Sequence, residues 1–175
     1  SKQEMKSEGI ELVLVVDVSE SMQADDLRPS RLEQAKVDLN KLVDLLTGHK
    51  IGLVAFAGSS TVLSPLTNDP SSLKLFIDSL STSSVSTQGT NFTEALQDAK
   101  SAFEHGGVEK DEHTSVTRAI LILSDGEDHE KGAIENAQKL ASEGIRIFSI
   151  AYGTEKGAPI PQRDMLGYLR GYKKD

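Results

Sequence analysis

Four short apolar runs, each too short for a buried helix, recur along the chain and limit the folds that it can adopt. The first of them, LVLVV, is apolar at every position rather than at alternate ones. Such a run is typical of a strand that is covered on both faces, as in a parallel sheet with helices on either side. The expected parallel strands are residues 10–17, 50–56, 118–124 and 146–152.

Stretches with apolar residues at helical spacing separate these strands. Ser30 and Glu33 form a capping box that opens a helix, and Gly48 is expected to close it. Helices are also predicted after Asp69 and after Asn91, and over residues 134–143. Alternation of strands with helices predicts an open, Rossmann-like α/β sheet that is doubly wound in three layers.

The remaining segments are predicted from their turn chemistry. Gly58 and Ser59 indicate a turn into a short antiparallel edge strand, residues 61–63. Two polar segments, 81–89 and 104–117, are interpreted as loops, and the tail after residue 153 predicts no regular element.

Composition restricts the classes of function. The 175 residues suit one domain, and no run of eighteen apolar residues predicts a membrane span. The net charge of −8 comes without a basic stripe, so we expect no nucleic-acid partner. There is no cysteine, which excludes disulfides, thiolate metal sites and cysteine nucleophiles. The first residues lack the apolar stretch of a signal peptide, so none is expected.

Oxygen-bearing side chains follow two of the predicted parallel strands. Asp17, Ser19 and Ser21 come after the first strand, and Asp125 follows the third. In open α/β sheets, ligands bind at the carboxyl ends of the strands, where these residues are expected to meet. Thr90, which precedes a helix, offers a further hydroxyl from a separate loop.

Oxygen ligands of this kind favour a hard cation. Mg²⁺ suits a small site with few carboxylates, and Mn²⁺ and Ca²⁺ are the alternatives. Neutral hydroxyls leave much of the ion's charge unquenched, so the ion would attract a carboxylate from another protein. The pattern therefore predicts a binding site rather than a catalytic one, and no enzyme activity.

These residues resemble the metal-ion-dependent adhesion site of von Willebrand factor type A domains. The family pattern is Asp-x-Ser-x-Ser with a later Thr and a later Asp. In this chain it is filled by Asp17, Ser19, Ser21, Thr90 and Asp125. The resemblance implies that all five residues bind the metal, and that the sheet is mostly parallel with one short antiparallel edge strand.

A narrower resemblance, to bacterial BatA/BatB-type proteins related to aerotolerance, covers roughly residues 9–175. It rests on the segments SMQADDLRPSRLEQAK, GLVAFAGSSTVLSPLTND, GTNFTEAL, LILSDGED and GTEKGAPIP. It implies a domain anchored in the bacterial inner membrane by flanking helices, expected on the periplasmic side. The implied partners are related proteins of the same family or a MoxR-type AAA+ ATPase system. Residues 1–8 are interpreted as a juxtamembrane linker, and the last helix and strand of the family as truncated.

Two other functions remain open from the residues alone. One is a Mg²⁺-dependent phosphatase-like hydrolase, although Ser19 stands where such enzymes have a second aspartate. The other is a structural scaffold with a vestigial site.

Several neighbouring residues are expected to have lesser roles. Thr93 competes with Thr90 as the metal hydroxyl, and Glu127 and Asp128 could contact the ligands. Asp25 and Asp26 either guard the site or pair with arginines. We expect Met22 to pack in the core and the four histidines to be exposed.

Overall fold

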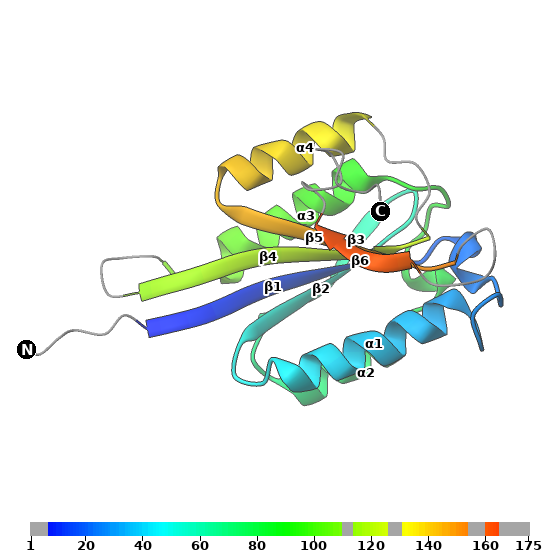
Figure 1. Ribbon diagram of the computed structural model, residues 1–175, viewed down its shortest axis with the longest axis horizontal. Helices are drawn as coiled ribbons and strands as arrows, with labels where there is room; N and C mark the ends of the chain where they lie inside the picture. The colour runs from blue at the N-terminus through cyan, green and yellow to red at the C-terminus, as the bar shows by residue number, and fades with distance from the viewer. Residues whose placement is uncertain (1–6, 110–113, 126–130, 154–159, 165–175) are drawn as a thin grey trace, which may run out of the picture.

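The computed structural model describes residues 7–109, 114–125, 131–153 and 160–164, which form one sheet between two layers of helices (Figure 1). The strands are β1 (Ser7–Asp17), β2 (Lys50–Phe56), β3 (Ser60–Thr67), β4 (Thr114–Ser124), β5 (Ile145–Ala151) and β6 (Ile160–Asp164). The helices are α1 (Arg31–Leu45), α2 (Pro70–Asp78), α3 (Phe92–Gly106) and α4 (Lys131–Ser142), with short 3₁₀ turns η1 (Glu20–Gln23) and η2 (Thr82–Ser84).

The strand order across the sheet is β3-β2-β1-β4-β5-β6. The four central strands are parallel, and β3 and β6 run antiparallel at the two edges. From β1 the chain winds first toward β2 and later toward β4, so the winding direction reverses beside β1. The predicted doubly wound α/β fold is confirmed. In addition to the expected antiparallel edge at β3, the described sheet has a second one at β6.

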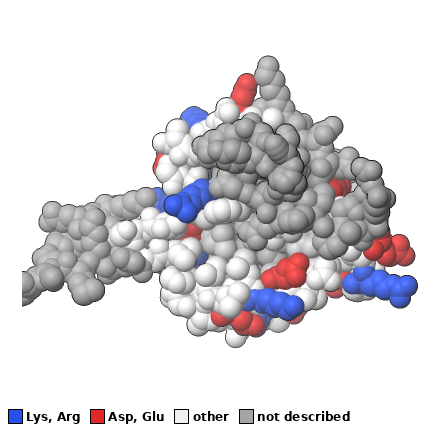
Figure 2. Space-filling view, viewed as in Figure 1, with Lys and Arg blue, Asp and Glu red and all other residues white. Residues whose placement is uncertain are grey.

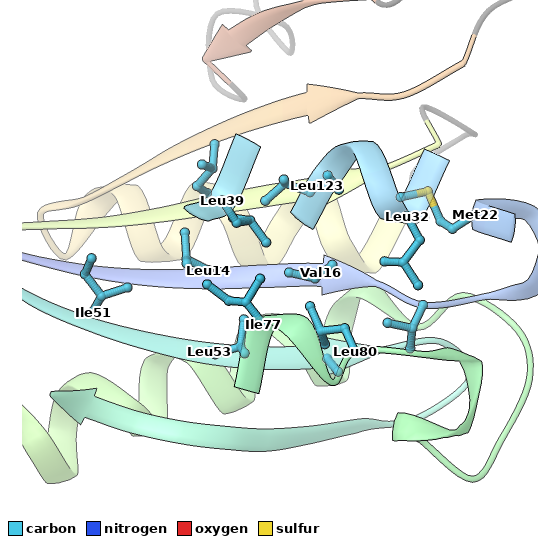
Figure 3. Close-up of a cluster of buried hydrophobic side chains, with 14 of the residues drawn as sticks. Leu14, Val16, Met22, Leu32, Leu39, Ile51, Leu53, Ile77, Leu80 and Leu123 are labelled. Atoms are coloured by element: carbon cyan, nitrogen blue, oxygen red, sulfur yellow. The ribbon is translucent and has the colours of Figure 1, made fainter. Parts of the chain in front are cut away.

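The sheet is covered on both faces, which explains why the middle of β1, residues 12–16, is apolar at every position. Leu14 and Val16 face the layer of α1 and α2, whereas Val13 and Val15 face that of α3 and α4. All four side chains are fully buried. Figure 3 shows the buried side chains on the α1 side of the sheet, which include Leu14 and Val16, with Met22 of η1 against Leu32 of α1.

Side-chain caps begin the helices where the sequence predicts them. Ser30 Oγ accepts a hydrogen bond from the Glu33 N–H at 3.0 Å, and Asn91 Oδ1 accepts one from the Glu94 N–H at 3.0 Å. Asp69 caps α2 in the same way. The end of α1 differs from the prediction, because the helix stops at Leu45 and Gly48 lies in the following turn with φ +95°.

The structure differs from the expected loops and boundaries at five points. The helix α3 extends to Gly106 and β4 begins at Thr114, so both ends of the expected 104–117 loop are regular structure. The 81–89 loop contains η2. β3 spans Ser60–Thr67, longer than expected, and β6 occupies part of the tail. β1 starts at Ser7, within the expected 1–8 linker.

The amino end of β1 contains a buried charge that sequence periodicity does not reveal. Glu11 is only 2% exposed, and its carboxylate accepts hydrogen bonds from Arg118 Nε and the Val108 N–H, both at 2.8 Å. Arg118 also donates to the Val108 carbonyl at 2.7 Å and lies over the Phe103 ring. This cluster fixes the connection after α3 to the amino end of the sheet, opposite the predicted site.

We expect Glu11→Gln to lower the free energy of unfolding by about 2 kcal/mol, since it leaves Arg118 without its counter-charge. The value is below that of a fully buried pair because the Arg118 side chain is 22% exposed. Urea denaturation measures the change. Glu33→Gln is the control, because its pair with Lys36 is more exposed and should change stability by less than about 0.5 kcal/mol. Equal effects of the two substitutions would contradict the prediction.

Candidate metal site

Asp17 ends β1 and is fully buried. Its Oδ1 accepts a hydrogen bond from the Ser19 N–H at 2.8 Å, which turns the chain out of the strand. Its Oδ2 is also buried, and it has no hydrogen-bond partner among the described residues. Burial raises the pKa of this carboxyl to about 6, against the opposing effect of the hydrogen bonds from Ser19, and the negative charge of Asp125 adds to the rise.

The two serines are held beside Asp17 by the short turn η1. Met22 of this turn is fully buried in the core, which anchors the segment that carries Ser19 and Ser21. The Oγ atoms of the two serines lie 3.0 Å apart. Ser19 is 7% exposed, whereas Ser21 is exposed to solvent. The segment therefore presents one nearly buried and one open hydroxyl.

Asp125 joins this group from the neighbouring strand. β4 runs parallel to β1, with Val16 opposite Leu123, so the ends of both strands reach the same edge of the sheet. Ser21 Oγ donates a hydrogen bond to Asp125 Oδ2. Hydrogen bonds thus link Asp17, Ser19, Ser21 and Asp125, four of the five predicted ligands, at the point where the winding of the sheet reverses.

Thr90 lies at the same edge of the sheet but outside this network. Its neighbour Asn91 donates its N–H to the Ala57 carbonyl at 2.6 Å, just after β2, which pairs with β1. Thr90 is exposed, and within the described part of the chain it makes no hydrogen bond to the other four residues. Thr93 lies inside the first turn of α3. A ligand role for Thr90 stays a prediction.

The acidic residues expected near the site differ in what the structure shows of them. Asp26 forms a two-point ion pair with Arg31, whose Nε and Nη2 donate at 2.9 and 3.0 Å. Of the two roles expected for Asp26, the structure therefore shows the pairing with an arginine. These hydrogen bonds hold the pKa of Asp26 below its usual range. Asp25 is exposed. Glu127 and Asp128 lie outside the described residues.

One positioning contact near the site was missed by the sequence analysis. The Tyr152 hydroxyl donates to Asp38 Oδ2 at 2.7 Å, which joins the segment after β5 to α1, and burial raises the pKa of the phenol. The aromatic residue after an apolar strand was the available signal, but nothing in the sequence indicated which carboxylate it would meet.

The histidine prediction is only partly correct. His105 is exposed, whereas His49 is half-buried and its Nδ1 accepts a hydrogen bond from the Ile10 N–H at 3.1 Å. His49 therefore has a structural contact at the start of β1. His113 and His129 lie outside the described residues.

The described side chains fit a hard cation. The buried Oδ2 of Asp17 needs a positively charged partner that the described residues do not supply. Within the described ranges, no three acidic or histidine side chains are grouped so that they could hold a metal ion, so a cation at this edge would depend on serine and threonine hydroxyls. Oxygen-only donors of this type suit Mg²⁺, and Mn²⁺ or Ca²⁺ less closely.

The fold and the site define an α/β protein with an Asp-x-Ser-x-Ser segment at the reversal point of a doubly wound sheet. The family model of the von Willebrand factor type A domain matches residues 12–127, and the chain belongs to this family. The chain is similar to the crystal structure of a conserved hypothetical protein, BatB, from Bacteroides thetaiotaomicron. The two are 41% identical with a TM-score of 0.76, over 87% of this chain and 71% of the other.

Other relatives extend the comparison. An aerotolerance-related membrane protein from Bacteroides fragilis has a TM-score of 0.74 and 39% identity, over 87% of this chain and 72% of its own. A Nocardia farcinica protein named UPF0353 is 35% identical over 89% of this chain, which spans only 49% of that relative. The chain thus covers about half the length of the curated relatives that it matches.

A more distant structure shows the fold alone. Proximal thread matrix protein 1 from the mussel byssus, described with a zinc-occupied MIDAS motif, has a TM-score of 0.66 at 22% identity, over 87% of this chain and 38% of its own. In this chain, no helix of the described residues is long and apolar enough to cross a membrane.

Proposed function

We propose that this domain is a metal-dependent protein-interaction module without enzyme activity, in which a partner protein supplies an Asp or Glu side chain to the metal. The observation that carries the proposal is the buried Oδ2 of Asp17, which lies next to the linked oxygens of Ser19, Ser21 and Asp125 and has no hydrogen-bond partner in the part of the chain that the structure describes. A carboxylate held this way is costly unless a cation neutralises it.

The five predicted ligands have different tasks in this proposal. Asp17 and Asp125 supply negative charge from the ends of β1 and β4, while Ser19, Ser21 and Thr90 supply neutral oxygens. A bound Mg²⁺ would add a positive centre that attracts an anionic oxygen. Five protein oxygens would leave one position of an octahedral Mg²⁺ open, and a partner carboxylate could fill that position in place of water.

The charge distribution supports a protein partner rather than a polyanion. On the face shown in Figure 2, the basic side chains of the described surface are scattered rather than gathered in a stripe. The chain as a whole has a net charge of −8. That the domain has no nucleic-acid partner is part of the proposal.

We further propose that the domain belongs to a protein anchored in the bacterial inner membrane and lies on the periplasmic side. The similar B. fragilis protein is described as an aerotolerance-related membrane protein, which supports the membrane context. Related von Willebrand factor type A proteins or a MoxR-type AAA+ ATPase system are the proposed partners, on the BatA/BatB-type resemblance alone.

The first test is titration calorimetry of the domain with Mg²⁺, Mn²⁺ and Ca²⁺. We expect saturable binding that Ser19→Ala weakens by about tenfold or more, because the hydroxyl nearest to Asp17 is lost. Ser71→Ala, at an exposed serine of α2, is the matched control and should bind like the wild type. No binding heat in the wild type would favour the vestigial scaffold.

The second test uses the domain as bait on membranes from the source cells, with Mg²⁺ or with chelator. A partner that is captured with Mg²⁺, lost with chelator and lost with Ser19→Ala is then purified. The acidic residues of this partner are then replaced one at a time, and one of the replacements should abolish binding to the domain. Phosphatase turnover with Mg²⁺ that Asp17→Ala abolishes would contradict the proposal.

A further inference from the structure

The end of β2 carries no side chain suited to a metal, yet both loops that bear serine and threonine ligands are attached to it. The Val18 N–H, next to Asp17, donates to the Phe56 carbonyl at 2.8 Å. The Asn91 N–H, next to Thr90, donates to the Ala57 carbonyl at 2.6 Å. Two adjacent carbonyls at the end of one strand therefore set where the two loops lie.

Gly58 extends this attachment to the other side of Thr90. Its N–H donates to the Thr87 carbonyl at 2.8 Å, so hydrogen bonds at residues 87 and 91 bracket Thr90. A Cβ atom on Gly58 would lie 2.1 Å from the Gln88 carbonyl oxygen. That oxygen belongs to the backbone, so no side-chain rotation can relieve the overlap and the loop would have to move by about 1 Å.

A second glycine completes the contact. Gly89 has φ +125°, a conformation that other residues rarely adopt, and a Cβ there would lie 3.3 Å from the Cα of Gly58. The absence of side chains on both residues lets the loop lie directly on the β2–β3 turn.

The β2–β3 turn on which the loop lies is itself tied to α3. The Ser60 N–H donates to Glu94 Oε2 at 2.8 Å, and the Ser60 hydroxyl donates to Asp98. Both carboxylates belong to α3, the helix that directly follows Thr90. The turn therefore holds the loop before Thr90 through Gly58 and the helix after it through Ser60.

We infer that Gly58 is a positioning residue of the metal site: the lack of a side chain at this residue sets the position of Thr90 relative to Asp17 and Ser19. The inference rests on the proposed function. It predicts that one added methyl group at Gly58, which offers no ligand itself, reduces metal binding because it displaces Thr90.

The test compares Gly58→Ala with the wild type by Mg²⁺ and Mn²⁺ calorimetry. We expect about a tenfold loss of affinity, as for other residues that orient metal ligands. Gly9→Ala is the matched control, because its Cβ would meet nothing within 4 Å at the amino end of β1, and its affinity should equal that of the wild type. A Gly58→Ala affinity equal to that of the wild type would overturn the inference.

A double-mutant cycle separates positioning of Thr90 from a general loss of structure. In the Thr90→Ala background, Gly58→Ala should cost less than about twofold, because the ligand that it displaces is already absent. The same tenfold loss in both backgrounds would overturn the inference. If Gly58→Ala fails to fold, Gly89→Ala is measured in the same cycle under the same criteria.

A metal-free measurement adds a second readout. In the wild type with chelator, the amides of Gly58 and Asn91 should be protected from hydrogen exchange by their bonds to Thr87 and Ala57, and Gly58→Ala should lower the protection of Asn91. Unchanged protection would contradict a displaced loop. If the wild type binds no metal, the proposed function and this inference both fall; if it binds metal and Gly58→Ala binds equally, only this inference falls.

Discussion

In the absence of metal, Asp17→Asn should become more stable relative to the wild type as the pH rises. The folded protein raises the pKa of Asp17 from 3.8 to about 6, so it binds this proton more tightly than the unfolded chain does. The stabilisation from the protonated carboxyl is complete below pH 3.8 and is lost as the pH rises through about 6. Because an asparagine cannot ionise, the Asp17→Asn protein does not lose this stability as the pH rises.

The full difference amounts to about 3 kcal/mol, of which about 2 kcal/mol should appear between about pH 4.5 and 8. No discount for solvent is needed, because Asp17 is fully buried. Urea denaturation of both proteins with chelator, over this pH range, measures the difference directly. Ser71→Ala should follow the wild-type curve. Parallel curves for Asp17→Asn and the wild type would show that the buried carboxyl is already neutralised without metal.

Metal addition should raise the stability of the wild type relative to Asp17→Asn. If Mg²⁺ binds the folded wild type as proposed, it should stabilise it in proportion to the logarithm of the metal concentration above the dissociation constant. Asp17→Asn lacks the central carboxylate and should show no such rise. A melting temperature of Asp17→Asn that rises with Mg²⁺ as much as that of the wild type would remove Asp17 from the ligand set.

The sequence was sufficient to predict the parallel core of the fold for a simple physical reason. A strand that is covered on both faces must be apolar at every position, and Val13 to Val16 meet this requirement without a polar interruption. Capping residues such as Ser30 and Asn91 then located the helix starts, because their side chains satisfy backbone N–H groups whatever the tertiary context.

The misplaced elements share a different cause. The sequence does not predict β6, because this edge strand pairs antiparallel with β5 and shows no continuous apolar run. The polar residues 114–117 belong to β4 through backbone pairing with β1, with Thr114 opposite Ser7, and a polar segment gives little sign of such pairing. Whether these segments form strands is determined by long-range backbone pairing rather than by local composition.

The grouping of four candidate ligands at one edge of the sheet could be predicted from the sequence, but the contacts that support them could not. Asp17, Ser19, Ser21 and Asp125 are recognisable because strand ends of a parallel sheet share one edge. Gly58 carries no functional group, and its proposed role depends on the Gln88 carbonyl, which lies where a Cβ atom at residue 58 would have to be placed. Contacts of this kind become visible only once the loops are placed in space.

Asp125→Asn should lose metal affinity by about 100-fold or more while changing the metal-free stability by less than about 1 kcal/mol. Asp125 is only half-buried, and the amide that replaces it can still accept the hydrogen bond from the Ser21 hydroxyl. Loss of its charge also removes a repulsion from Asp17, which offsets part of any lost bond. Calorimetry with Mg²⁺ and urea denaturation with chelator measure the two quantities on the same protein.

Asp25→Asn is the matched control, because it removes the same charge from an exposed residue of the segment that follows η1. Its Mg²⁺ affinity should stay within about twofold of the wild type if binding depends on coordination rather than on the general negative field, which solvent and salt screen at exposed positions. Equal losses of Mg²⁺ affinity in both variants would show that Asp125 acts only through its general negative charge and not as a ligand. Together with Asp17→Asn, these measurements should distinguish the two carboxylates of the proposed site. The buried Asp17 should destabilise the metal-free fold and the half-buried Asp125 should hardly affect it, while loss of either should abolish or strongly weaken metal binding.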